Sequence, residues 1–197
     1  MNKFLIFLIV IFSCKKEVYY YPSKSFFDEN KPKEIIIENL SYGEIVDSLT
    51  NQIFKGKRHF IEIKDSNKIY KISPFTYTGG YIRERNGLYI RNDSLDLMKG
   101  MFPISDLSKY LKLHYENNDK EYYYAFSYKR AYIRLILERD DSSGKLKKIL
   151  LNLVEVYNKT DIKNKDSIKL GIMLDYLLKP VFPLTPPLSP NEIIEEL

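Results

Sequence analysis

Two histidines and one acidic loop are the best candidates for chemistry in this chain of 197 residues. His59 lies beside Phe60 and Ile61 in a strand-like stretch, and His114 lies on the apolar side of a helix-like stretch. No Gly-x-Ser-x-Gly or His-Glu-x-x-His motif accompanies them, so we interpret both as packing or boundary residues. The sequence therefore predicts no catalytic residue, and we expect a protein that is not an enzyme.

The acidic loop, residues 140–144, has the sequence Asp-Asp-Ser-Ser-Gly and is similar to a calcium-binding loop. An EF-hand loop needs a glutamate at its twelfth position, where this chain has Leu151. The loop is therefore interpreted as a turn that caps a helix. One cysteine and two histidines are too few for a Cys/His zinc site, and Gly79-Gly80 lacks the spacing of a phosphate-binding loop. We expect no metal and no cofactor.

Seventeen tyrosines and a net charge of +5 bear on the class of partner. Tyr122, Tyr123 and Tyr124 fall in an expected strand, where alternate side chains point to opposite faces. This arrangement favours sheet packing over a flat stacking surface for sugars. Basic residues are interleaved with acidic ones along the chain, which argues against a concentrated basic face and hence against a nucleic-acid partner.

The single cysteine, Cys14, follows a short apolar segment at the N-terminus. Lys3 precedes this segment, residues 4–12, which is about half the ~20 residues that a membrane-spanning helix needs. The small residue Ser13 then precedes the cysteine, so the pattern indicates a cleavable secretory signal. This segment resembles the lipobox of bacterial lipoproteins, and its Phe-Ser-Cys-Lys-Lys form resembles lipoproteins of the Bacteroidetes group.

The resemblance implies that residues 1–13 are a signal peptide and that Cys14 is diacylated as the new N-terminus. An ordinary signal peptide with an incidental thiol and an uncleaved anchor are the two alternatives. Lys15 follows the cysteine, where lipoproteins retained in the inner membrane tend to have aspartate, so we expect the outer membrane. The expected partners are the membrane, through the lipid anchor, and another envelope protein.

The sequence of the mature chain predicts a division into three segments. Residues 14–33 contain two prolines, five lysines and no apolar periodicity, which is typical of a flexible linker. Residues 34–178 carry helical and strand patterns and are expected to form a single domain. Residues 179–197 are rich in proline and are interpreted as a closing strap or tail.

Helices are expected at three places in the domain. Ser41 and Glu44 have the spacing of a capping box, which starts a helix that ends near Gly56. Ser105 is the expected N-cap of a helix over residues 106–117. The third helix follows the acidic loop and has apolar residues at helical spacing from Leu146 to Tyr157.

Strands are expected between these helices, including two hairpins. The second hairpin is expected around Asn86-Gly87, because both residue types tolerate the positive φ of a tight turn. Residues 168–174 fit a strand or a helix, and Gly171 favours the strand. The expected strands are residues 35–37, 59–64, 68–72, 80–84, 88–92, 121–127, 131–138 and 168–174.

The stretch from Arg85 to about Asp175 begins Arg-Asn-Gly-Leu-Tyr-Ile-Arg-Asn and continues with helix, strands, helix and strand. This order resembles the periplasmic domain of biopolymer-transport proteins that energise outer-membrane receptors, over roughly half of the chain. That family's anchor is a membrane helix with a functional aspartate, whereas residues 4–12 contain no acid. The resemblance therefore implies a fold and not proton coupling.

We expect an α+β domain with an antiparallel or mixed sheet and about three packed helices. The expected function is that of an envelope lipoprotein acting as a non-catalytic binding or scaffolding module. The alternative is an envelope hydrolase whose site forms only in the fold. In that case His59 or His114 should lie within hydrogen-bond reach of a carboxylate and a hydroxyl.

Overall fold

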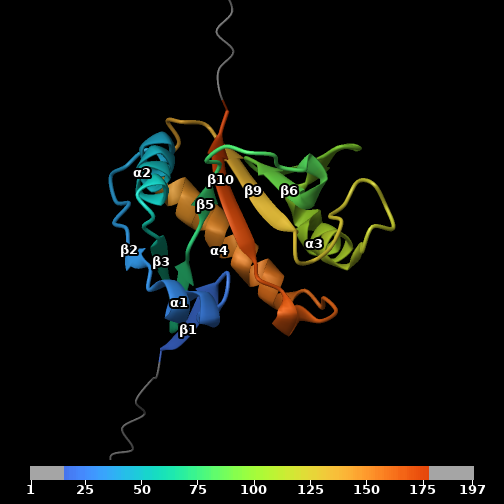
Figure 1. Ribbon diagram of the computed structural model, residues 1–197, viewed down its shortest axis with the longest axis horizontal. Helices are drawn as coiled ribbons and strands as arrows, with labels where there is room; N and C mark the ends of the chain where they lie inside the picture. Colours follow the sequence, from blue (N-terminus) through green and yellow to red (C-terminus); the bar gives the residue numbers. More distant parts are fainter. Residues whose placement is uncertain (1–15, 178–197) are drawn as a thin grey trace, which may run out of the picture.

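The computed structural model describes residues 16–177, which form an α+β fold with mixed sheets (Figure 1). Cys14 and the proline-rich segment 179–197 lie outside the described residues. The helices of the described part are α1 (Lys24–Asn30), α2 (Tyr42–Phe54), α3 (Leu107–Glu116) and α4 (Ser143–Lys159).

The smaller sheet has four strands in the order β1-β4-β3-β2. β3 and β4 form an antiparallel hairpin across Ser66-Asn67, which confirms the first expected hairpin. β1 and β2 each pair in parallel, with β4 and β3 respectively. The bounds are β1 (Glu17–Tyr21), β2 (Lys33–Glu34), β3 (His59–Asp65) and β4 (Lys68–Ile72).

The larger sheet has six strands in the order β5-β10-β9-β6-β7-β8. The first four are parallel to one another, and β7 and β8 continue the sheet as antiparallel strands. The bounds are β5 (Phe75–Thr76), β6 (Gly87–Arg91), β7 (Ser94–Leu97), β8 (Gly100–Pro103), β9 (Tyr132–Leu137) and β10 (Gly171–Tyr176).

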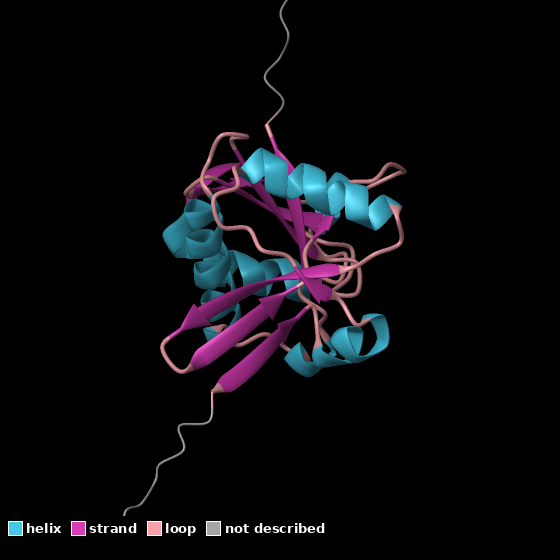
Figure 2. Ribbon diagram, turned by 90° about the vertical axis from the view of Figure 1, so that its left-hand side faces the viewer, coloured by secondary structure: helices cyan, strands magenta, loops and turns pink. Residues whose placement is uncertain are grey.

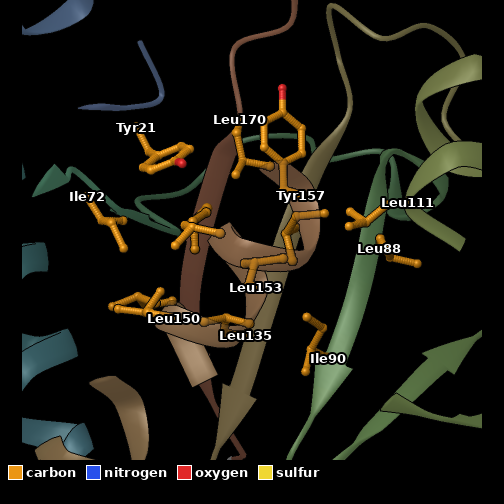
Figure 3. Packing of buried hydrophobic residues seen from close by; sticks show 14 of the residues in the cluster. Tyr21, Ile72, Leu88, Ile90, Leu111, Leu135, Leu150, Leu153, Tyr157 and Leu170 are labelled. Atoms are coloured by element: carbon orange, nitrogen blue, oxygen red, sulfur yellow. The ribbon is translucent and has the colours of Figure 1, made fainter. Parts of the chain in front are cut away.

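Helix α4 joins the two sheets into one hydrophobic core. Its buried residues recur at helical spacing and include Leu150, Leu153 and Tyr157. Figure 3 shows these side chains between Tyr21 and Ile72 on one side and the large sheet on the other. Figure 2 shows helices on both sides of the strands. The N-terminal strand and the large sheet therefore share the same core.

Two local predictions about helix and strand are confirmed. Ser41 caps α2 with a capping box, because its hydroxyl accepts from the Glu44 N–H while Glu44 accepts from the Ser41 N–H. The ambiguous segment near Gly171 is strand β10, paired in parallel with β9. Since β9 is buried on both faces, its neighbour needs apolar residues on both faces as well, which explains the ambiguous pattern.

The flexible linker predicted for residues 14–33 is wrong from residue 17 onward. Glu17 donates its N–H to the Asn67 carbonyl at 3.0 Å, and β1 runs from there along β4. Tyr21 is buried and its hydroxyl donates to Asn158 at 2.8 Å. Helix α1 follows and packs Phe27 against the ring of Phe60, at 5.5 Å between centroids. The packing of its aromatic residues therefore orders this segment, although its polar composition is typical of a flexible linker.

The hairpin predicted around Asn86-Gly87 is also wrong. Residues 84–86 form a 3-10 turn, and the hairpin partner of β6 is β7, across Asn92 and Asp93. Asn86 is buried, and its side-chain oxygen accepts the N–H of Phe126 at 3.1 Å. These long-range contacts hold Asn86 in place, whereas Asn92 has the positive φ of 52° that the turn requires.

Three other predicted elements differ from the structure. Residues 121–127 form turns instead of a strand, because Asn117 bonds this segment through its side-chain amide. Ser105 does not cap α3, which follows a 3-10 turn over residues 104–106. Residues 35–37 do not form the expected strand, because β2 is confined to Lys33–Glu34, and Ile37 beyond it is buried in the core.

Candidate functional site

His114 is a packed residue whose two ring nitrogens both have partners. Nε2 lies 3.0 Å from the Asn86 carbonyl and Nδ1 lies 3.4 Å from the Ala125 N–H. The carbonyl can only accept, so Nε2 carries the proton and Nδ1 accepts. Burial lowers the pKa of His114 to about 4. The ring is therefore neutral at pH 7 and fixes the loop that follows α3.

His59 lies in β3 of the small sheet, whereas His114 lies in α3. The Nδ1 atom of His59 is buried without a hydrogen-bond partner among the described residues. Burial lowers its pKa, and the nearby charges of Lys57 and Lys33 lower it further. The hydrolase alternative requires a histidine that is hydrogen-bonded to a carboxylate and a hydroxyl. Within residues 16–177 neither histidine forms such a bond.

The acidic loop caps α4, as the sequence predicts. The Ser142 hydroxyl accepts the Lys145 N–H at 3.2 Å, and Asp141 forms an ion pair with the Lys145 side chain at 2.8 Å. Within residues 16–177 no group of three or more His, Cys, Asp or Glu side chains is placed to hold a metal ion. The described part also has no helix with the length and apolar character for crossing a membrane.

An exposed cleft of about 470 Å³ lies where the loop before β6 meets the β7–β8 turn and the loop after α3. We call it the aromatic–arginine cleft. Tyr81, Met98 and Tyr122 are its most exposed apolar residues, at 87%, 57% and 64% of their surface. The cleft is lined by Tyr81, Ile82, Arg83, Glu84, Arg85, Met98 and Tyr122.

Arg85 builds the wall of this cleft. Its Nε donates to the Tyr124 carbonyl at 3.2 Å, and its terminal nitrogen pairs with Asp119 at 2.5 Å. The guanidinium also lies over the Tyr122 ring, 5.4 Å from the centroid. Three contacts therefore fix Arg85 to the loop after α3, and the arginine in turn positions Tyr122.

Asn117 organises the same loop from within. Its amide group donates to the carbonyls of Glu121 and Ala125 at 2.8 and 2.9 Å, and its oxygen accepts the Glu121 N–H at 2.8 Å. Asn117 is buried, so these bonds also satisfy polar groups that water does not reach. The loop can then present Tyr122 and Tyr123 outward while Tyr124 turns into the core.

Arg83 is the unpaired charge of the cleft. It is exposed, and no carboxylate of the described residues lies within ion-pair distance of it. Glu84 is engaged instead with Arg134 and Tyr89, and Arg134 also pairs with Asp175. The cleft therefore combines exposed aromatic and thioether surface with one free guanidinium.

Lys99, beside the cleft, is held by its own neighbours. Its ammonium donates to the Tyr124 hydroxyl at 2.6 Å and lies over the rings of Phe102, Tyr110 and Tyr124. The hydrogen bond to Tyr124 raises the pKa of Lys99. These contacts hold the β7–β8 turn in place. Met98, which lines the cleft, belongs to the same turn and is positioned with it.

No sequence pattern assigns a functional role to the cleft residues, which come from three loops distant along the chain. Tyr122, which the sequence predicts to pack in a sheet, is instead exposed in a turn. The nearest signals are the two arginines at positions 83 and 85 and the Tyr-Tyr pair at positions 122 and 123. Comparison with protein-family models, with curated proteins and with solved structures finds no match.

Proposed function

We propose that this protein is a lipid-anchored envelope protein whose aromatic–arginine cleft docks another envelope protein without catalysis. The composition of the cleft supports this proposal, because tyrosine, methionine and arginine are enriched in protein interfaces and lysine and glutamate are depleted. Buried tyrosine and arginine contacts also dominate binding energies. The single observation that carries the proposal is free Arg83 beside exposed Tyr81, Met98 and Tyr122.

The chemistry of the cleft indicates the kind of partner. A carboxylate would form a charge-assisted hydrogen bond with Arg83, and an aromatic or aliphatic side chain would fill the space beside Tyr81 and Tyr122. The proposed partner is therefore an acidic polypeptide segment that also carries apolar residues.

The anchor part of the proposal depends on Cys14. A short apolar run, Ser13 and the single cysteine support lipidation at its Sγ atom. Two or more acyl chains give stable anchoring where one chain gives only reversible binding. Lys15 after the cysteine supports residence in the outer membrane, where the domain would meet its partner.

Affinity capture from solubilised envelopes tests the docking proposal with a matched pair of variants. Arg83→Glu reverses the free charge of the cleft. Arg58→Glu reverses the charge of another arginine, next to β3. Arg58 is also exposed and has no ion pair among the described residues. We expect the wild type and Arg58→Glu to retain one acidic protein that Arg83→Glu loses by about tenfold or more. Equal recovery by both variants would contradict the proposal.

A further inference from the structure

The first strand begins only three residues after Cys14, at Glu17. If Cys14 is lipidated, as the proposed function requires, this distance limits where the domain sits. Three residues of extended chain span at most about 11 Å. The headgroup layer on one side of a bilayer takes up roughly 5 to 8 Å of that distance. The start of β1 must then lie within a few ångströms of the headgroups.

The structure identifies which end of the fold this is. Glu17 is paired with Lys68 at the start of β4, and its N–H donates to the Asn67 carbonyl at 3.0 Å. The β3–β4 turn, Ser66-Asn67, therefore lies directly beside the point where the chain enters the fold. In Figure 2 the strand with which the described chain begins and the end of a strand hairpin lie at the same lower end of the molecule.

The charges at this end suit an anionic surface. Lys16 and Lys68 have no carboxylate within ion-pair distance among residues 16–177, whereas Lys64 is paired with Glu62 at 3.1 Å. The acids of the same end are Glu17, Glu62 and Asp65. Lys15 precedes Lys16 in the sequence, so four lysines stand against these three acids and basic groups outnumber acidic ones by one. Basic side chains next to a membrane anchor are attracted to anionic headgroups.

We propose that the β3–β4 turn rests against an anionic phospholipid surface, and that the short tether from Cys14 holds it there. The lipid anchor would then set the orientation of the domain as well as its location. The surface involved is distinct from the aromatic–arginine cleft, because β1 lies at the lower left of Figure 1 and β6 at the upper right. One protein could therefore contact membrane and partner together.

Tryptophan fluorescence tests this orientation directly, because the chain contains no tryptophan. Asn67→Trp places the reporter in the β3–β4 turn. Asp93→Trp places it at the matching position of the β6–β7 turn, and both sites are exposed second residues of two-residue turns. We expect lipids that carry a quencher near the headgroup to quench Asn67→Trp several-fold more strongly. Equal quenching, or stronger quenching of Asp93→Trp, would overturn the proposal.

A linker variant tests the role of the tether. Inserting about twelve glycine and serine residues between Lys16 and Glu17 would give the domain roughly 20 Å of extra root-mean-square reach. We expect this insertion to reduce the quenching of Asn67→Trp to the level of Asp93→Trp. Unchanged quenching would show that the short tether does not hold the turn against the lipid.

These measurements are made with the chain from Cys14 onward, its thiol coupled to a maleimide lipid in vesicles of phosphatidylethanolamine and phosphatidylglycerol. The coupling uses the same Sγ atom that lipidation would use. A failure of the orientation proposal therefore appears in the vesicles. A failure of lipidation itself appears separately, as absent acyl labelling of Cys14 in cells.

Discussion

Arg85 and Tyr122 face each other in the wall of the aromatic–arginine cleft, with the guanidinium carbon 5.4 Å from the ring centroid. Arg85 is also bound to Asp119 and to the Tyr124 carbonyl. Arg83, two residues earlier, has no ion pair among the described residues. The two arginines therefore have different roles, since Arg85 builds the cleft and Arg83 is free to meet a ligand.

Replacing each arginine separates these roles. Arg85→Ala should lower the free energy of unfolding by about 1 to 2 kcal/mol, because it removes the charge-assisted hydrogen bond to Asp119 and one of the two donors to the Tyr124 carbonyl. Arg83→Ala should change it by less than about 0.5 kcal/mol. Urea denaturation measures both values, and a larger loss for Arg83→Ala would contradict the assignment.

The capping box of α2 predicts a local stability effect. Ser41→Ala removes the acceptor of the Glu44 N–H and should lower the free energy of unfolding by about 1 kcal/mol. Ser105→Ala is the matched control, because Ser105 is an exposed serine before a helix that it does not cap. The urea midpoint should fall for the first variant only; a midpoint of Ser41→Ala equal to that of the control would speak against the capping role.

The buried ring of His114 predicts a pH dependence of stability. Burial lowers its pKa from 6.5 to about 4, so the unfolded chain takes up a proton more readily than the folded chain as the pH falls. The stability from the neutral ring is complete above pH 6.5 and is lost as the pH falls towards 4, by about 3 kcal/mol in total.

His114→Gln keeps an N–H donor for the Asn86 carbonyl but cannot titrate, so it should remove most of that loss. Denaturation at pH 7 and at about pH 4 checks the expectation. His59→Gln is the comparison variant, because His59 is only partly buried and should keep most of the wild-type slope. An unchanged slope in His114→Gln would show that another group titrates.

The elements predictable from the sequence are those decided by local contacts. The α2 capping box, the β3–β4 hairpin and the cap of α4 all join residues within a few positions of one another. Local patterns do not decide between an antiparallel and a mixed sheet, because the pairing of β9 with both β6 and β10 joins strands far apart in the chain.

Two of the incorrect predictions share a physical cause, which is hydrogen bonding by buried asparagine side chains. Asn86-Gly87 has the local signal of a hairpin, yet the Asn86 side chain and carbonyl are committed to Phe126 and His114. Residues 121–127 are rich in aromatic residues that are common in strands, yet the amide of Asn117 bonds their backbone in turns. The cleft depends on these bonds, so it was not predictable as a unit.

The anchor predicts a clear change in partitioning. Cys14→Ala removes the thiol that would carry the acyl chains and should move the protein from the membrane fraction to the soluble fraction. Metabolic labelling with an alkyne fatty acid, followed by fractionation of the envelope, checks both steps. Labelling that persists in Cys14→Ala would contradict lipidation at this residue, and recovery of the wild type with inner membranes would contradict outer-membrane residence.

Photo-crosslinking in intact cells tests the central claim, that the aromatic–arginine cleft docks a partner protein. A benzophenone amino acid replaces Tyr81 or Tyr122, and a third variant carries it at Phe54, an exposed aromatic residue at the end of α2. We predict one discrete adduct with an acidic envelope protein from positions 81 and 122, none from position 54, and loss of the adduct when Arg83→Glu is added. No adduct at either cleft position, or an equal adduct at position 54, would contradict the claim.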